Sequence, residues 1–596
     1  MSQQPDATGA DLPATRQALP GPYGAHVPRD VVGSHMTRTG SFPAVEEPVR
    51  PEPPLRDRLL HDLLGQRSLG LGRRSSDRLW GWLGALVVTA IAAGVRLWAL
   101  GRPGKLVFDE TYYVKEGWSL ASLGFEAAWP DDPNPAFEAG DVSSYKTDEA
   151  EYVVHPPVGK WMIAIGMRLM GGAGDPVAWR IASAVIGVLA VFLMVRIARR
   201  LFSSTLLGLL AGLLLAVDGE AIVHSRTGLL DQFLMFWVLV AFGCLVLDRE
   251  WARRRLAERV AQIVEAGGSV GKYGPRLGFR WWRFAAAVSL GLACGVKWSG
   301  LYFVAAFCLL TVVWDLTARR TAGIGRWWED ALVVDAVPAA LVMLPTVAAV
   351  YVASWSAWFA HPMSYLRSWA VVNGATPPGW WPDWGWAQAS WEAGRSLWEY
   401  HRMMWDFHTG LDSDHNYASH PLGWIVQWRP TSFFWEKHVP GQGPCPADAA
   451  GDCASAVTAL GNPLLWWLAA LAIPVVLVLV VRFRDWRGTA ALVGIAAGWL
   501  PWFLYSWPLA DRTIFTFYSI VFTPFVVLTL VYLLAVGLER TPRRSFDRRV
   551  VCGLATVLVV LMVGVSVLYY PIWTAMSVPY EYWQRLMLFP SWIGPS

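Results

Sequence analysis

An adjacent pair of acids, Asp109 and Glu110, lies nine residues beyond the first apolar stretch that is long enough to cross a bilayer. A carboxylate at the edge of a membrane is costly when dry, so this pair needs a chemical or structural reason. The two acids repel each other, and no local cation explains them. A positioned carboxylate can take the proton from a hydroxyl group, so we predict that the pair is part of an active site.

Three cations stand at the ends of apolar stretches, on the same predicted side of the membrane as the acids: Arg226, Lys297 and Arg512. Arginine and lysine are the residues that bind phosphate most often, so this set suits a lipid phosphate. Each cation also has a structural alternative. Arg226 can pair with Asp231, five residues later; Lys297 can extend to the interface; and Arg512 can pair with Asp511.

A third motif, His155-Pro156-Pro157-Val158-Gly159-Lys160, opens an amphipathic stretch that runs to about Met170. Prolines suit the first turn of a helix, so we predict a helix on the membrane surface, in which His155 is a site candidate or a turn residue. A later polar segment contains five histidines whose spacing matches no compact metal motif: His401, His408, His415, His420 and His438. We therefore predict no metal and no other cofactor.

Composition places these motifs in a membrane protein. Of the 596 residues, 54% are hydrophobic and only 16% are charged, and 37 are tryptophan, a residue that gathers at bilayer interfaces. Apolar windows predict eleven spans, near 80–100, 177–198, 202–217, 228–247, 283–297, 299–316, 331–353, 463–481, 489–507, 513–537 and 550–570. The basic residues are spread over the ends of the connections rather than forming one patch, which argues against nucleic-acid binding.

Arginines follow every second predicted span, and by the positive-inside rule these connections face the cytoplasm. The N-terminus is then cytoplasmic and the C-terminus extracytoplasmic. Residues 1–78, rich in Pro, Gly, Arg and Asp, are predicted to be a disordered cytoplasmic tail. An N-terminal membrane module, 79–353, carries the acidic motif in its first outer loop, 101–176. A large outer loop of surface helices, 354–462, precedes a C-terminal module, 463–596.

Two cysteines, Cys445 and Cys453, share the large loop. If that loop is extracytoplasmic it lies in an oxidising compartment, and we predict that the two form a disulfide. The alternative is a pair of free thiols.

Together the motifs resemble those of the protein O-mannosyltransferases, membrane glycosyltransferases of the GT-C class. The resemblance rests on Phe108-Asp109-Glu110, on His155 to Lys160 with Val158 in place of Leu, on Ser225-Arg226 to Asp231, and on three later strings. These are Lys297-Trp298, Ser419-His420-Pro421 and the stretch from Trp499 to Arg512. The large loop is too short for the soluble β-trefoil insert of fungal and animal members, so the chain resembles a bacterial and, by composition, an actinobacterial member.

The resemblance implies an all-α polytopic fold of the GT-C type and a place in the bacterial plasma membrane. It implies inverting transfer of mannose from a polyprenyl-phosphate-mannose donor to Ser or Thr of secretory polypeptides near the Sec translocon. Asp109 would be the general base and Glu110 its support or an acceptor contact, with Arg226, Lys297 and Arg512 on the phosphate. Further site candidates are His155, Lys160, Asp231 and His420.

Two other functions remain open from the sequence. A related GT-C enzyme could glycosylate a glycolipid or a cell-wall glycan with the same donor and the same base. A transporter or flippase of lipid-linked sugars would instead place ionisable groups near the bilayer midplane, with repeat symmetry between its halves. The sequence contains no internal repeat, and its charges cluster outside the spans.

Overall fold

The computed structural model describes residues 53–506 and 512–594. Residues 1–52 of the predicted disordered tail lie outside the described residues. The prediction is wrong for the rest of the tail, where Leu55–Leu64 form helix α1 and Gln66–Gly70 form helix α2. Leucines of α1 pack in one apolar cluster with residues 256–261 and 318–324. Helix α1 is amphipathic and buries Leu59, Leu60 and Leu63.

Among the described residues, nine helical runs are long and apolar enough to cross a membrane. They are α3 (Ser75–Leu97), α7 (Pro176–Leu201), α10 (Leu230–Glu265), α12 (Gly300–Thr321), α13 through α14 (Trp327–Ser354), α18 (Pro463–Phe483), α19 with α20 (Trp486–Ser506), α21 (Thr523–Arg540) and α22 (Phe546–Trp573). A bent pair, α8 (Thr205–Val217) and α9 (Gly219–Ser225), and the shorter apolar helix α11 (Trp281–Val296) accompany them. Each of the eleven predicted spans overlaps one of these segments, which confirms a polytopic helical membrane protein.

The α8–α9 pair bends by 64° at Asp218. The carboxylate of Asp218 is fully buried and accepts hydrogen bonds from the backbone N–H of Ala221 at 3.1 Å and of Asn462 at 3.0 Å. The indole N–H of Trp466 donates a third, also at 3.0 Å. These bonds satisfy polar groups that a broken helix would otherwise leave unpaired within a bilayer.

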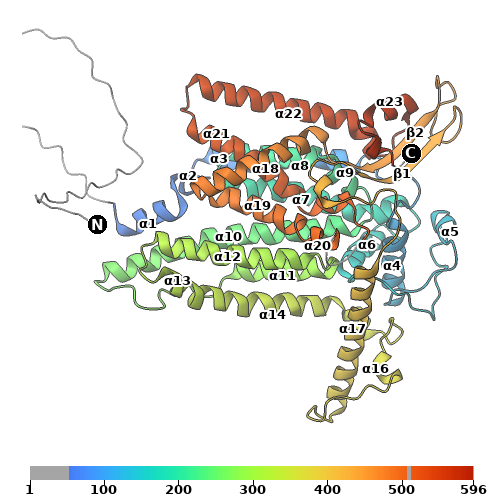
Figure 1. Ribbon diagram of the computed structural model, residues 1–596, viewed down its shortest axis with the longest axis horizontal. Helices are drawn as coiled ribbons and strands as arrows, with labels where there is room; N and C mark the ends of the chain where they lie inside the picture. Colours follow the sequence, from blue (N-terminus) through green and yellow to red (C-terminus); the bar gives the residue numbers. More distant parts are fainter. Residues whose placement is uncertain (1–52, 507–511, 595–596) are drawn as a thin grey trace, which may run out of the picture. The chain divides into compact units, whose positions relative to one another are not determined.

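The connection after α3 folds over one end of the bundle (Figure 1). It contains α4 (Glu110–Leu123), α5 (Asn134–Glu138) and α6 (Val158–Leu169). Helix α6 matches the predicted amphipathic helix that follows the paired prolines, and it packs against α4 and α7. This connection brings the acidic motif to the ends of the spans.

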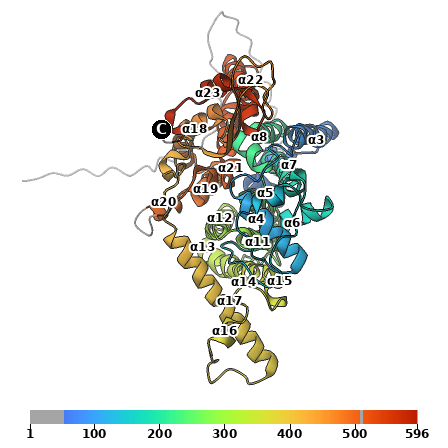
Figure 2. The ribbon, with the colours of Figure 1, turned by 90° about the vertical axis from the view of Figure 1, so that its right-hand side faces the viewer.

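The connection between α14 and α18 was predicted to contain only surface helices, and this is wrong in part. It contains α15 (Ser356–Ala360), α16 (Trp369–Val372), the long helix α17 (Gly385–Gly410), and two strands, β1 (Thr431–His438) and β2 (Cys453–Ala459). The strands pair antiparallel, and a short third strand, β3 (Val578–Pro579), extends the sheet in the order β1-β2-β3. Figure 2 shows α17 extending away from the helix bundle, with α16 beside its outer part. The first half of β1 alternates between buried and half-buried side chains, as a strand packed on one face does.

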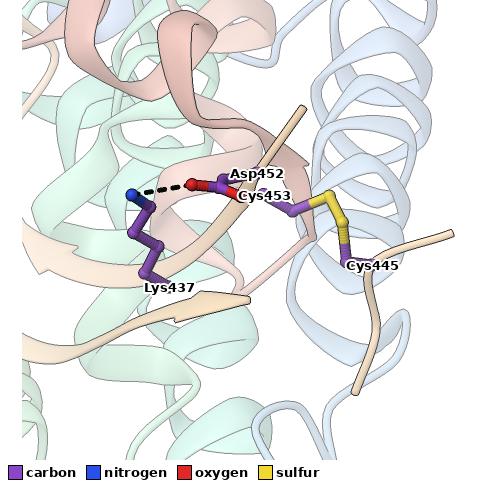
Figure 3. Close-up of a disulfide and its surroundings, with 4 residues drawn as sticks. All are labelled: Lys437, Cys445, Asp452 and Cys453. Atoms are coloured by element: carbon purple, nitrogen blue, oxygen red, sulfur yellow. Dashed lines mark ion pairs between the residues drawn. A yellow bond between two sulfur atoms is a disulfide. The ribbon is translucent and has the colours of Figure 1, made fainter. Parts of the chain in front are cut away.

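The predicted disulfide between Cys445 and Cys453 is present, with a Cα–Cα distance of 5.6 Å (Figure 3). This separation is normal for a disulfide. Beside it, Lys437 of β1 and Asp452 form an ion pair of 2.7 Å. The disulfide holds the β1–β2 connection to the start of β2, and the ion pair holds the end of β1 to the residue before β2.

Candidate active site

A polar cavity of about 50 Å³ lies where α10 and α12 begin, α11 ends and the second half of α17 passes. Its charged and imidazole groups are contributed by Asp231, Lys297, Arg512, His155 and His408. Six aromatic residues and two hydroxyl residues complete its wall: Trp298, Tyr302, Trp405, Trp502, Tyr505, Tyr518, Ser299 and Thr409. The cavity therefore joins the connection after α3, the large connection between α14 and α18, and the segment after α20.

Asp109, at the N-cap position of α4, does not itself line this cavity, but it interacts electrostatically with Lys297 and Asp231, which do. The hydroxyl of Tyr113 donates a hydrogen bond to its Oδ2 at 3.3 Å. Loss of contact with water raises the pKa of Asp109 to about 6, an effect that Lys297 opposes and Asp231 reinforces. At neutral pH most Asp109 side chains are then ionised while remaining strong enough bases to accept a proton.

The backbone that positions Asp109 is fixed by its neighbour Phe108, which has a φ of +50°. A left-handed conformation is unfavourable for a bulky residue, so packing must compensate for it. The ring of Phe108 packs on Phe433 of β1 at a centroid distance of 4.8 Å, and on Phe517 at 5.4 Å and Phe515 at 5.9 Å. The large connection and the segment after α20 thus position the acidic motif together.

Glu110 was predicted to hold the acceptor or to tune Asp109, and in the structure its carboxylate makes buried structural hydrogen bonds. Its side chain is fully buried, so it cannot contact an acceptor. The carboxylate accepts hydrogen bonds from the Arg180 guanidinium at 2.8 and 2.7 Å, and from the backbone N–H groups of Val107 at 2.9 Å and Gly228 at 2.7 Å. Glu110 therefore joins α4 to α7 and to the start of α10. Its counter-ion is Arg180, which lies 70 residues later in the sequence.

Arg226 was predicted to bind phosphate or to pair with Asp231, and the structure shows neither. It is 2% exposed and donates to the carbonyl oxygens of Arg96 at 2.8 Å, Trp98 at 2.6 Å and Ala99 at 2.8 Å. These carbonyls belong to the C-terminal end of α3, where helical partners run out. The arginine caps that helix instead of facing the cavity.

Asp231 and Lys297 form an ion pair of 2.7 Å that lines the cavity. Asp231 lies in the first turn of α10, and Lys297 ends α11, so the pair bridges two spans. The ammonium group also lies 5.4 Å from the ring centroid of Tyr518. Lys297 keeps its charge at the cavity wall, and Asp231 orients it.

Arg512 also lines the cavity, as predicted for a phosphate ligand. Its Nε has no hydrogen-bond partner among the described residues although it is buried. Asp511, the alternative ion-pair partner, lies outside the described residues. A buried guanidinium donor without a partner at a cavity wall is suited to accept an anionic ligand.

His155 and His408 stack with their ring centroids 5.1 Å apart. The Nε2–H of His408 donates to the carbonyl of Val154 at 2.8 Å, and the Nδ1 atoms of both rings have no partner within the described part of the chain. Burial lowers the pKa of His408 to about 4 and, together with Lys297, holds the pKa of His155 well below its usual range. Both rings are therefore neutral at physiological pH. They can form hydrogen bonds with a ligand but offer it no positive charge.

Two other candidates lie outside the cavity. Lys160 is fully buried in α6, where it pairs with Glu126 at 2.7 Å and Glu116 at 3.5 Å. His420 is exposed and caps the 3₁₀ turn Pro421–Gly423, accepting from the backbone N–H of Leu422 at 3.2 Å. Both have structural roles that explain their place in the motifs.

The matches to known proteins agree with this geometry. The family model described as the "C-terminal four TMM region of protein-O-mannosyltransferase" matches residues 394–592, and the one described as "Dolichyl-phosphate-mannose-protein mannosyltransferase" matches residues 137–360. A polyprenol-phosphate-mannose–protein mannosyltransferase of Mycolicibacterium smegmatis (strain MKD8) is 38% identical over 526 residues, which cover 87% of this chain and 94% of the relative. The chain belongs to the protein O-mannosyltransferase family.

Another relative and one solved structure agree with this family and its fold. The similarly named protein of Mycobacterium tuberculosis (strain ATCC 25618 / H37Rv) is 36% identical over 538 residues, covering 87% of this mannosyltransferase and 92% of the relative. The Saccharomyces cerevisiae Pmt1-Pmt2 complex bound to the sugar donor superposes with a TM-score of 0.62 at 15% identity, covering 86% of this chain and 92% of that chain. The predicted GT-C fold and glycosyltransferase class are confirmed.

The sequence did not point to several groups of the candidate site. Tyr113 contacts Asp109, and Tyr518 contacts Lys297. His408 contributes an imidazole from α17. Tyr113 carried a signal, since it is four residues after Asp109 and one helical turn brings the two together. Tyr518 carried none, and His408 was considered only as a metal ligand, because only tertiary packing brings the two to the cavity.

Proposed function

We propose that this protein transfers mannose from a polyprenyl-phosphate-mannose donor to Ser or Thr hydroxyls of proteins. The observation that carries the proposal is that Asp109, a base with a pKa of about 6, interacts with Lys297, which lines a cavity with a second cation, Arg512. The donor and acceptor follow from the names of the mycobacterial relatives, which match nearly the whole of this chain.

In the proposed reaction the acceptor hydroxyl lies between Asp109 and the anomeric carbon of mannose. Its oxygen attacks that carbon from the side opposite the phosphate, so the new C–O bond forms as the bond to the phosphate oxygen breaks. The hydroxyl proton moves to Asp109, the anomeric configuration inverts, and polyprenyl phosphate leaves. One direct displacement of this kind needs only a base and stabilisation of the leaving group.

Arg512 and Lys297 are proposed to bind the phosphate as its charge develops. Arg512 has an unpartnered Nε, and Lys297 is held in place by Asp231 at 2.7 Å. A fixed cation stabilises developing charge without having to reorganise during the step. The neutral rings of His155 and His408 are suited to hydrogen bonds with the sugar hydroxyls.

We further propose that the cavity faces the extracytoplasmic side of a bacterial plasma membrane. The arginines in the second half of α10 and in the connection after α21 support this orientation by the positive-inside rule. Acceptors would then be secretory polypeptides, met close to the Sec translocon. A topology reporter fused after Ser596 should be active outside the cytoplasm, and activity restricted to the cytoplasm would contradict the orientation.

The function is tested by incubating the purified protein with polyprenyl-phosphate-[¹⁴C]mannose and a Ser/Thr-rich peptide. Label should appear on the peptide and be released by β-elimination, since the bond is an O-glycoside. A peptide with every Ser and Thr replaced by Ala is the matched control. Transfer to a membrane glycolipid or glycan but to no peptide would instead support the related GT-C activity.

A further inference from the structure

A second cavity lies at the other end of the bundle from the candidate active site, with a volume of about 1000 Å³. Its wall is formed by α2, the start of α3, the α7–α8 turn and the α21–α22 turn. In Figure 1 these elements gather at the end remote from α4 and β1. No catalytic or donor-binding role assigned above uses these residues.

The charge of this cavity is strongly positive. Five arginines line it, against two acids, Asp77 and Glu539. Both acids are already paired, Asp77 with Arg199 at 2.8 Å and Glu539 with Arg487 and Arg67 at 2.7 Å each. Four lining arginines have no ion pair among the described residues: Arg73, Arg74, Arg543 and Arg548. Arg548 already donates to the carbonyl oxygens of Leu538 at 2.7 Å and Thr541 at 3.3 Å, which leaves Arg73, Arg74 and Arg543 for a ligand. The cavity therefore offers unneutralised guanidinium groups to a ligand.

An apolar groove of about 450 Å³ continues from this cavity toward the middle of the membrane. The continuity is visible helix by helix. Helix α8 lines the basic cavity up to Leu207 and the groove from Leu210, and α21 lines the cavity from Ala535 and the groove up to Leu534. On α22 the change falls between Arg548 and Val551. Each step is three residues or fewer, which is about 4.5 Å along a helix.

The groove lies between α22 and its neighbours along residues 551–562 of that helix. It is lined by side chains of α8, α18, α21 and α22, all of them Leu, Val, Ala or Met. Helix α22 buries only 11% of its most apolar window within the protein, the lowest share among the nine described spans. An apolar chain in this groove would fill the space between α22 and its neighbours.

We propose that this cavity and groove form one binding site for a membrane phospholipid with an anionic headgroup. The phosphate would contact Arg73, Arg74 and Arg543, and an acyl chain would lie between α8, α21 and α22. A basic pocket at the end of membrane spans, continuous with an apolar groove, matches both parts of such a lipid. A soluble phosphate would use the arginines alone, and a zwitterionic lipid would use the groove without the excess charge.

The proposal is tested by native mass spectrometry of the full chain, purified in mild detergent and titrated with phosphatidylglycerol or phosphatidylcholine. Phosphatidylglycerol should be retained preferentially. The variant Arg73→Gln/Arg74→Gln/Arg543→Gln should bind it on the order of 100-fold more weakly, since each arginine contributes separately. The control Arg259→Gln/Arg320→Gln/Arg326→Gln removes the same charge from exposed positions outside both cavities and should bind normally.

A second pair of variants tests the groove without changing charge. Ala555→Trp places an indole in the groove and should weaken phosphatidylglycerol binding at least tenfold, whereas Val557→Trp, on the exposed side of α22, should not. Both triple variants should retain mannosyl transfer, which shows that they fold. Equal retention of the two lipids, or equal binding by the two triple variants, would overturn the proposal. Tighter binding of a polyprenyl phosphate through the same arginines would also overturn it and assign the site to the prenyl carrier.

Discussion

Arg180 holds Glu110 through two hydrogen bonds, of 2.8 and 2.7 Å, and both side chains are fully buried. This pair separates the roles of the two adjacent acids. Glu110 points into the protein and fixes the start of α4, so that Asp109, the next residue back, is left to interact with Lys297 and Asp231 of the cavity wall. The acidic motif is thus one structural carboxylate and one carboxylate free for chemistry.

The first prediction concerns this ion pair. Glu110→Gln leaves the Arg180 charge buried without a counter-ion, which typically costs about 3–5 kcal/mol. Thermal unfolding in detergent should show a clearly lowered midpoint, while donor affinity of the folded fraction is kept. Glu149→Gln, which removes a carboxylate from an exposed pair with Lys146, is the control and should change little. An unchanged midpoint with abolished transfer would return Glu110 to the catalytic machinery.

The second prediction separates the two arginines expected at the phosphate. Arg512→Gln removes a cavity cation and should weaken donor binding about tenfold to 100-fold, the value of a hydrogen bond to a charged group. Arg226→Gln removes the cap of α3 and should lower stability instead. Donor affinity and the thermal midpoint are measured on both variants. Arg512→Gln should lower donor affinity with little change in the thermal midpoint, and Arg226→Gln should lower the midpoint with little change in donor affinity. Loss of donor affinity in Arg226→Gln alone would restore the role predicted from the sequence.

The disulfide gives a third prediction. Closing the short loop between Cys445 and Cys453 is expected to stabilise the folded sheet by about 2–3 kcal/mol. Cys445→Ser/Cys453→Ser should therefore increase hydrogen exchange in β1 and β2, with α7 as an internal reference that stays protected. Mass spectrometry of the unreduced protein should detect the linked pair. Free alkylation of both thiols before reduction would contradict the disulfide.

The spans and the disulfide were predictable because hydropathy, span length and the presence of two cysteines in one polar loop are local properties of the sequence. The partners of the charged groups were not. Asp231 and Lys297 are 66 residues apart, and Glu110 and Arg180 are 70 apart, so packing alone brings each pair together. Arg226 was misassigned because its acceptors are backbone carbonyls, which exist at every helix end and leave no mark on side-chain types.

The fourth prediction is a pH dependence. Asp109 must be ionised to accept a proton, and its pKa is raised to about 6, so the transfer rate should fall as pH drops through that value. His408, with a pKa lowered to about 4, stays neutral over this interval. Glu116 is the group to control for, since burial raises its pKa to about 7. Glu116→Gln should keep the profile, and a rate that is flat down to about pH 4.5 would exclude Asp109 as the base.

The most direct measurement is the single-turnover rate of mannosyl transfer to a Ser/Thr peptide in Asp109→Asn, compared with donor affinity in the same preparation. Asparagine has the size of aspartate but cannot accept the hydroxyl proton. Donor binding should be preserved while the rate falls by about 10²–10⁴-fold, the usual contribution of a general base. A near-normal rate in Asp109→Asn would contradict the assignment of Asp109 as the catalytic base.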